Sequence, residues 1–247
     1  MKSVTIITAR CRSSRLPNKI LKNLSKNIKC IDILIERAKK IKLPIIVATS
    51  RNKSDDKLCN YIKKKNYNVL VFRGSSKNKL LRWFNCFKKY NIQKACMIDG
   101  DDIFFDFNLY KKQIKKIKEH DMLSSDSSMI TGVYTHVIQL SALNKMFKLF
   151  NRNIDSEMIE PFILRSRIKR KFIKFDSIFH QKGIRLTLDY SEDLKLIRYL
   201  KKKFSITINT KTIINFMKKN KKISNINYFR ENFWKKNQLK KIDALNI

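Results

Sequence analysis

Three arginines, two serines and a lysine follow the first apolar run of this 247-residue chain, between residues 10 and 19. The run itself, Val4–Ala9, is rich in β-branched residues and predicts a buried strand. Guanidinium and ammonium groups can neutralise phosphate oxygens, and hydroxyls and backbone N–H groups can bind others. A buried strand ending in such a loop is typical of α/β proteins that hold a polyphosphate. The alternative is a solvated basic loop, and charge alone does not separate the two.

A cluster of carboxylates follows a second apolar run, in the sequence Asp99-Gly100-Asp101-Asp102. In open α/β sheets, ligands bind beyond the carboxyl ends of the strands, which is where this cluster falls. Neighbouring carboxylates repel one another, and Mg²⁺ in proteins commonly takes one or two carboxylates together with phosphate oxygens. The cluster therefore favours a cation site. The alternative is an acidic turn that caps the following helix.

A third candidate, Asp189, stands between the segment Ile184–Leu188, which predicts a strand, and a helix predicted over Ser191–Lys202. Its position again follows a strand and precedes a helix. On its own it is equally consistent with an ordinary helix N-terminus, and Glu192 and Asp193 are assigned only to that role.

The order of residues in the first loop resembles the signature of the cytidylyltransferases that make CMP-sugars. These include the CMP-3-deoxy-manno-octulosonate and CMP-acylneuraminate synthetases and the spore-coat polysaccharide nucleotidyltransferases. One departure is Asn18, where the family usually has glycine. Asparagine is the best non-glycine residue for left-handed backbone, so we expect the loop to keep its shape. The matching residues are Ala9, Arg10, Ser13, Arg15, Leu16, Pro17 and Lys19.

The resemblance implies a role for each matching residue. In the family the loop wraps the triphosphate of the incoming nucleotide, and two aspartates, in Gly-Asp and Arg-Leu-Thr-x-Asp elements, bind magnesium. Asp101 and Asp189 match those aspartates, so Mg²⁺ is the expected cofactor. The expected catalytic residues are Arg10, Arg15, Lys19, Asp101 and Asp189. The expected nucleotide contacts are Ala9, Arg10, Ser13, Arg15, Lys19, Arg73 and Asp99.

Two further departures from the family pattern are visible. Ile103 and Phe104 stand where a proline is usual after the acidic cluster. Met158 stands where the spore-coat branch often has a histidine. The resemblance covers about residues 3–205 and leaves the last forty residues unmatched.

The reaction that the resemblance implies is transfer of CMP from CTP to a sugar acid or related sugar, giving a CMP-sugar and pyrophosphate for surface polysaccharide synthesis. The sugar hydroxyl attacks the α-phosphate directly, so the chemistry needs no Ser-His or Cys-His nucleophile, and none is evident. The alternative function is a metal-dependent glycosyltransferase that uses Asp99 and Asp101 as an Asp-x-Asp element. Such an enzyme has no need of a triphosphate-binding loop after its first strand.

Elements that position these residues alternate regularly in the first hundred residues. Continuous apolar strands alternating with helices predict an α/β fold, with a mostly parallel central sheet and helices on both faces. By resemblance this is the nucleotide-diphospho-sugar transferase type. After the first strand, strands are predicted over 45–49, 68–72 and 95–98, and helices over 31–41, 54–65 and 80–90.

Regularity fades after residue 120. Strands are predicted over 133–140 and 172–175, and helices over 141–150 and over 155–167, the latter interrupted by Pro161. We expect a single domain over residues 1–247. By resemblance, 121–184 forms the sugar side of the site and a dimer contact, so a homodimer is expected. Residues 206–247 are expected to be a helical extension whose aromatic residues pack.

The composition narrows the partners. A formal net charge of +36 suggests nucleic-acid binding at first, but lysines occur in nearly every segment rather than in one stripe. We attribute the charge to the bias of an AT-rich genome and expect no specific nucleic acid. Five widely spaced cysteines without a C-x-x-C pair favour reduced thiols in a cytoplasm. The three histidines are assigned surface or structural roles, and no apolar run predicts a membrane span.

Overall fold

The apolar runs of the first hundred residues form neighbouring parallel strands in the computed structural model, which describes residues 1–149 and 155–243. The strands are β1 (Ser3–Thr8), β4 (Ile45–Ser50), β5 (Leu70–Gly74) and β6 (Lys94–Asp99), in the order β5-β4-β1-β6. Between them lie α1 (Cys30–Lys39), α2 (Asp56–Lys64) and α3 (Lys79–Lys89). A hairpin of β2 (Asn23–Ser25) and β3 (Ile28–Lys29) precedes α1.

The sheet continues beyond β6 in mixed directions. Strand β8 (His136–Gln139) runs antiparallel to β6 and to β7 (Met122–Ser124), and β9 (Arg170–Phe172) lies parallel to β7 at the edge. The strand predicted over 133–140 is therefore shorter in the structure and begins only at His136. Residues before His136 turn instead, because the Val133 carbonyl accepts from the Asp106 N–H at 2.8 Å.

Helices of the second half are α4 (Phe107–Lys116), α5 (Leu140–Leu149), α6 (Glu160–Arg165), α7 (Ser191–Lys203), α8 (Thr210–Lys219), α9 (Lys221–Tyr228) and α10 (Arg230–Asp243). Short 3₁₀ turns span Lys19–Leu21, Lys53–Asp55 and Ser177–His180. Phe150, the end of a predicted helix, lies outside the described residues. The helix predicted over 155–167 begins only at Glu160, because Pro161 occupies the first turn, where a missing N–H costs nothing.

The segment Ile184–Leu188 is not a strand, contrary to the prediction. The N–H groups of Leu186 and Leu188 donate to the carbonyls of Thr131 and Asp101, each at 2.9 Å. Both carbonyls belong to turns, so the segment is held by turn backbone rather than by a ladder. This arrangement fixes the approach to Asp189 against the turn that carries Asp101.

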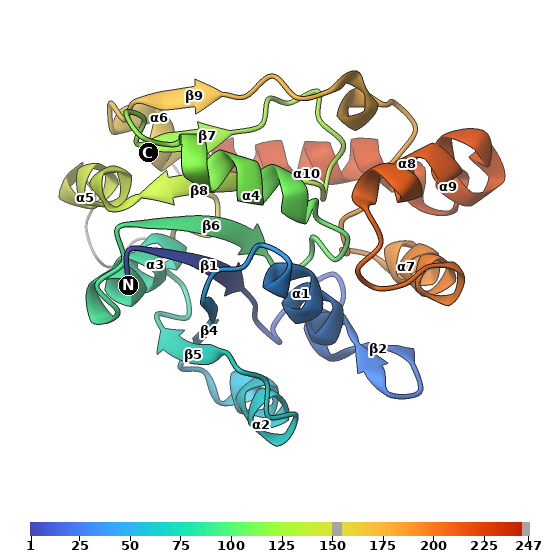
Figure 1. Cartoon of the computed structure of the whole chain (residues 1–247), viewed down its shortest axis with the longest axis horizontal. Coiled ribbons are helices and arrows are strands. Elements are labelled where there is room, and N and C mark those ends of the chain that lie inside the picture. The colour runs from blue at the N-terminus through green and yellow to red at the C-terminus, as the bar shows by residue number, and fades with distance from the viewer. Residues whose placement is uncertain (150–154, 244–247) are drawn as a thin grey trace.

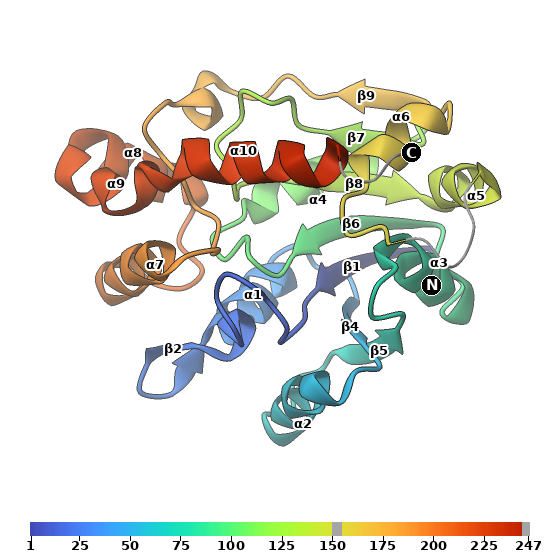
Figure 2. The same ribbon diagram turned by 180° about the vertical axis from the view of Figure 1, so that it is seen from behind.

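Apolar residues cover both faces of the sheet. One core lies between the sheet and α1, α2, α4, α7 and α8, and the other lies between the sheet and α3, α5 and α6. Helix α10 crosses the sheet on the same side as α3 (Figure 2). Figure 1, from the other side, shows α4 in front and α10 behind. Among the described residues, no helix is both long and apolar enough to cross a membrane.

The aromatic residues of the C-terminal segment pack less fully than expected. Phe229 and Phe233 are 61% and 52% exposed, respectively. Trp234 packs against the guanidinium of Arg185, which lies 5.3 Å from its ring centre. A basic helix carries few apolar residues on any face, so only part of the aromatic stripe meets the core.

Arg37, a buried arginine of α1, ties the turn after β6 to the C-terminal half. Its guanidinium donates to the carbonyl of Phe105 at 2.7 and 3.1 Å, and to those of Ile206 and Ile208 at 3.0 and 2.8 Å. Burial lowers the pKa of Arg37 to about 10, so the side chain stays charged at neutral pH. These bonds anchor the backbone that follows the acidic cluster.

Gly132 marks the closest approach between the 130–135 turn and the 184–188 segment. Its φ is +95°, and a Cβ there would lie 2.5 Å from backbone atoms of Leu186 and Thr187. We expect Gly132→Ala to lower the free energy of unfolding by about 2 kcal/mol or more, because strain and a backbone clash add. Urea denaturation measures this loss.

Gly183→Ala is the matched control, since Gly183 also has a positive φ, +85°, but a methyl group there would meet nothing within 4 Å. We expect it to cost only the conformational strain, about 1 kcal/mol. Equal losses in the two variants would show that the contact at Gly132 is not a tight one.

Candidate active site

The carboxyl ends of the parallel strands meet at one edge of the sheet. Thr8 at the end of β1 lies opposite Asp99 at the end of β6, which brings the loops after these strands together. The Gly100 N–H donates to the Thr8 carbonyl at 2.9 Å, and a Cβ on Gly100 would lie 2.8 Å from that oxygen. Only glycine allows this approach without a shift. The acidic cluster therefore lies directly beside the first loop.

The first loop is shaped by its own short contacts. Asn18 adopts the left-handed conformation, with φ 55°, which confirms the expectation that it replaces the family's glycine. Its N–H donates to the Cys11 carbonyl at 2.9 Å, and the Cys11 N–H donates to buried Asp55 at 2.6 Å. The Ser13 hydroxyl accepts from the Leu16 N–H at 3.3 Å. The loop is thus closed on itself and anchored to the end of β4.

An ammonium group lies at the centre of the site. Lys19 Nζ donates to Asp101 Oδ2 at 2.9 Å, Asp189 Oδ1 at 3.0 Å and the Leu188 carbonyl at 2.7 Å. Arg15 Nη2 lies 2.5 Å from the same Asp189 oxygen. Arg15, Lys19, Asp101 and Asp189, predicted from separate motifs, are therefore in direct contact. Ala9 is buried beneath the loop.

Burial and charge act in opposite directions on these groups. Burial would raise the pKa of Asp189, but Lys19 and Arg15 outweigh it and hold the pKa near 2. Burial would lower the pKa of Lys19, but Asp101 and Asp189 raise it above its ordinary value. The pKa of Asp101 is raised by burial and by the carboxylates of Asp189 and Asp99, against the opposing effect of Lys19. Lys19 and Arg15 thus offset the mutual repulsion of the two carboxylates.

The residues present fit a divalent cation. Two carboxylates, Asp101 and Asp189, already share one cationic group, and their hard oxygens suit Mg²⁺ when substrate phosphates supply further ligands. Within residues 1–149 and 155–243, no group of three or more His, Cys, Asp or Glu side chains is arranged to hold a metal alone. A cation at this place would therefore take its remaining ligands from water or from substrate oxygens.

Asp99 belongs to a separate polar group. Its carboxylate pairs with Lys79 Nζ at 2.8 Å, and although burial opposes this, Lys79 lowers the pKa of Asp99. His136 of β8 faces the same group, and burial lowers its pKa to about 3 despite the nearby Asp99. Asp99 and Asp101 thus contact different cations.

Asp102, the last carboxylate of the cluster, does not join the ion centre, the group formed by Arg15, Lys19, Asp101 and Asp189. It is buried and accepts from the Thr135 hydroxyl at 3.0 Å. Burial, with the charges of Asp101 and Asp99, raises its pKa well above the ordinary value. Buried Ile103 and Phe104, which replace the family's proline, hold the turn from inside the core.

Two predicted nucleotide contacts have protein partners. Arg10 donates to the Ser76 carbonyl at 2.8 Å and pairs with Glu157 at 3.1 Å, so it links the first loop to the loop after β5. Arg73 donates to the carbonyls of Ser50 and Asn52, both at 3.0 Å, and pairs with Asp56. Arg73 therefore braces the end of β4, and its predicted nucleotide role stays a prediction.

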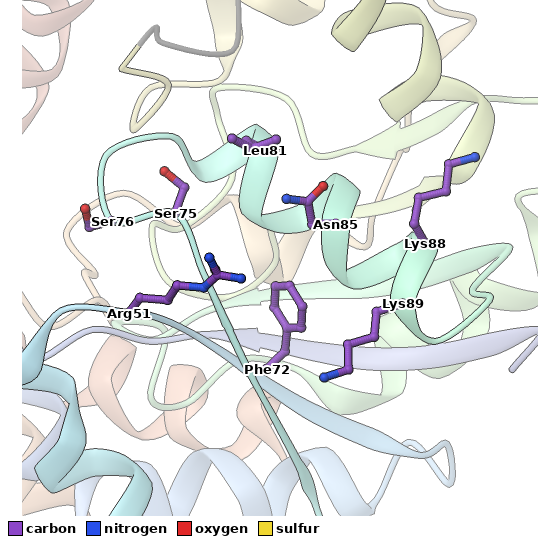
Figure 3. Close-up of a pocket in the computed structure, with 9 residues that line it drawn as sticks. Arg51, Phe72, Ser75, Ser76, Leu81, Asn85, Lys88 and Lys89 are labelled. Carbon is purple, nitrogen blue, oxygen red and sulfur yellow. The ribbon is translucent and has the colours of Figure 1, made fainter.

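A cavity of about 570 Å³ lies beside the loop after β5 (Figure 3). In Figure 3, Arg51, Ser75 and Ser76 lie at one end and Lys88 and Lys89 at the other, with the Phe72 ring between Arg51 and Lys89. None of the predicted site residues lines it. It adjoins the first loop through Ser76, whose carbonyl Arg10 contacts. The remaining lining residues are Gly74, Leu81 and Asn85.

The comparison with known families decides the assignment. A family profile described as Cytidylyltransferase matches residues 4–236 of this chain. The chain belongs to the cytidylyltransferase family.

Individual relatives agree with that assignment. The chain is 35% identical over 237 residues to an uncharacterized protein of Methanocaldococcus jannaschii, covering 92% of this chain and 95% of that one. It is 27% identical over 213 residues to the spore coat polysaccharide biosynthesis protein SpsF of Bacillus subtilis, covering 80% of this chain and 85% of that protein.

Solved structures show the same fold. A cytidylyltransferase from Leptospira borgpetersenii matches with a TM-score of 0.79 at 23% identity, covering 90% of this chain and 96% of that one. A CMP:2-keto-3-deoxy-manno-octonic acid synthetase solved with CTP matches with a TM-score of 0.62 at 13% identity, covering 82% and 99%. The nucleotide-diphospho-sugar transferase type of α/β fold expected from the sequence is thereby confirmed, and the protein is a nucleotidyltransferase.

Three site residues of this cytidylyltransferase escaped the sequence analysis. Lys79 stood just before the helix predicted over 80–90, His136 inside the strand predicted over 133–140, and Glu157 inside the helix predicted over 155–167. Glu157 lay in a segment that resembles the family, and this was the only sequence signal among the three. Their partners lie 20 or more residues away along the chain, so only the folded structure brings them together.

His136 gives the cytidylyltransferase a specific pH dependence of stability. The folded-state pKa near 3 lies below the ordinary value of 6.5, so the unfolded chain binds a proton that the folded chain does not. The free energy of unfolding should therefore fall as pH drops from about 6.5 to 4.5, by at most about 1.4 kcal/mol per pH unit from this group. Urea titrations at several pH values measure the slope.

His136→Gln should flatten that slope, because the titrating group is gone. His120→Gln serves as the control and should leave the slope as it is in the parent. An unchanged slope in His136→Gln would show that this imidazole takes up its proton in the folded protein as readily as in the unfolded one.

Proposed function

We propose that this cytidylyltransferase transfers CMP from CTP to a sugar acid or a related sugar, releasing pyrophosphate, in the cytoplasm and for surface polysaccharide synthesis. The observation that carries the proposal is the contact of Lys19 with both Asp101 and Asp189, with Arg15 beside it. The two cationic side chains of this group suit a triphosphate, and its two carboxylates suit a divalent cation. The relationship to the spore coat protein SpsF supports the polysaccharide role.

In the reaction, an acceptor hydroxyl oxygen forms a bond to the α-phosphorus of CTP. The bond from that phosphorus to the α,β-bridging oxygen breaks, pyrophosphate leaves, and the hydroxyl proton passes to water. Arg10, Arg15 and Lys19 would hold the β- and γ-phosphates and stabilise the negative charge that develops on the leaving group. Ser13 and the closed turn at Asn18 keep these cations on one short loop.

Asp101 and Asp189 are the residues that would hold Mg²⁺. When bound, that ion would withdraw charge from the α-phosphate and so favour attack by the acceptor. Backbone contacts within the chain hold the residues that carry these carboxylates in place. Asp101 is fixed by the Gly100–Thr8 contact, and its carbonyl accepts from the Leu188 N–H next to Asp189.

Pyrophosphate release measured over a panel of nucleoside triphosphates and sugar acids, with Mg²⁺ or with EDTA, tests the function. We expect release only with CTP, one class of acceptor and Mg²⁺. Asp101→Asn should lower the rate by about 100-fold or more, because it removes a charge from the reacting centre without changing side-chain shape. Asp243→Asn, at an exposed carboxylate at the end of α10, is the control. Full activity of Asp101→Asn would remove Asp101 from the site.

Arg15→Ala and Lys19→Ala should each lower kcat/KM for CTP by about tenfold or more, since a charge-assisted contact contributes roughly 1.5–3 kcal/mol. Binding of a CMP-sugar product should change much less, because that product lacks the β- and γ-phosphates. Isothermal titration with CTP and with the product measures the contrast, and Lys26→Ala, at an exposed lysine, is the control. Unaltered CTP binding in both variants would reduce the first loop to a basic surface.

A further inference from the structure

Arg185 is a fully buried arginine that contacts three carboxylates. Its Nη2 lies 3.0 Å from Asp189, its Nε lies 3.1 Å from Asp193, and its Nη1 lies 2.9 Å from Glu231. The three acids come from the loop before α7, from α7 and from α10. A guanidinium suits this position because its planar fork presents several donors in fixed directions.

The contact with Arg185 divides the two oxygens of Asp189 between different partners. Oδ2 accepts from Arg185, whereas Oδ1 faces Arg15 and Lys19. The backbone is fixed as well, because Asp193 Oδ2 accepts from the N–H of Asp189 at 2.7 Å. Asp189 is therefore held with one oxygen directed at the ion centre and the other turned to the interior.

Glu231 holds the far side of the same guanidinium. It is the one residue of α10 that is buried among those the structure describes. Its Oε2 accepts from Arg185, and its Oε1 accepts from the Thr131 hydroxyl at 2.7 Å. Helix α10 runs from this point across the sheet (Figure 2). A glutamate of the C-terminal helix α10 thus contacts the residue that holds Asp189.

We propose that Glu231 is a positioning residue for nucleotidyl transfer. It acts through Arg185 to keep Asp189 Oδ1 negatively charged and directed at a divalent cation. The proposal rests on the proposed function in one respect, the role of Asp189 as a metal-binding carboxylate. With Glu231 neutral, the charge of Arg185 is shared by Asp189 and Asp193 alone. Asp189 is then drawn toward Arg185, and the negative potential at Oδ1 falls, which weakens cation binding.

Glu231→Gln tests this inference, with Glu192→Gln as the matched control. Glu192 pairs with Arg230, the neighbour of Glu231 in the chain, so both variants remove one negative charge beside the start of α10. Of these two glutamates, Glu231 contacts Arg185 and Glu192 does not. The probe is Mn²⁺ added to the full-length protein without nucleotide, with free Mn²⁺ measured by electron paramagnetic resonance. The Mg²⁺ concentration for half-maximal pyrophosphate release is measured in parallel.

We expect Glu231→Gln to raise both the Mn²⁺ dissociation constant and the half-activating Mg²⁺ concentration by about tenfold, the size typical of a lost outer-shell partner. The KM for CTP at saturating Mg²⁺ should stay within twofold of the parent value, and Glu231→Asp should restore most of the cation affinity. Glu192→Gln should change none of these quantities. A merely structural role would lower the melting temperature without this selective loss.

Mn²⁺ binding by Glu231→Gln at parent strength, or an equal loss in Glu192→Gln, would overturn the proposal. Should Glu231→Gln not fold, Thr131→Val removes only the hydrogen bond to Glu231, and a two- to threefold loss of Mn²⁺ affinity is then expected, with no loss counting against the proposal. A parent that neither binds Mn²⁺ nor uses Mg²⁺ would refute the metal role in the proposed function itself. If the parent binds Mn²⁺ and uses Mg²⁺, and Glu231→Gln does both equally well, this inference alone is refuted.

Discussion

The ammonium group of Lys19 is the contact on which the site depends. It joins the first loop to the acidic cluster after β6 and to the segment before α7, through Asp101, Asp189 and the Leu188 carbonyl. Without a cation between them, the half-buried carboxylate of Asp101 and the buried one of Asp189 would repel each other across a region that screens charge less well than water. The features around it, from the close approach of Gly100 to the left-handed turn at Asn18, keep these three segments within reach.

The same charge balance explains why the buried acids of this region do not act alike. Asp189 has Arg15, Lys19 and Arg185 around it and stays ionised. Asp102 has a hydroxyl as its partner, and burial raises its pKa well above the ordinary value. Buried carboxylates of one region can therefore differ in pKa, according to which cations the fold places beside them. A net charge of +36 is thus a poor guide to the charge at any single place.

Much of the fold follows from local sequence pattern, because continuous Ile and Val runs alternating with amphipathic helices have few other arrangements. The first loop and both acids could be located because their residue order resembles a family. Arg73 could not be understood in this way, since its partners near the end of β4 are set by strand pairing. Ile184–Leu188 resembled a strand because every second residue is apolar, yet turn carbonyls accept from the N–H groups of Leu186 and Leu188. The roles of His136 and Glu231 depend on contacts that no local pattern records.

The two residues of the central ion pair lie far apart in the sequence, and this separation affects how the protein folds. Lys19 and Asp189 are 170 positions apart, so their ion pair closes a very long loop and cannot form by local collapse. Its entropy of closure must be offset by contacts made earlier, chiefly the pairing of β1 with β4 and β6. The parallel strands can therefore be in place before the charged centre exists, and that centre is complete only once the C-terminal half has docked against the sheet.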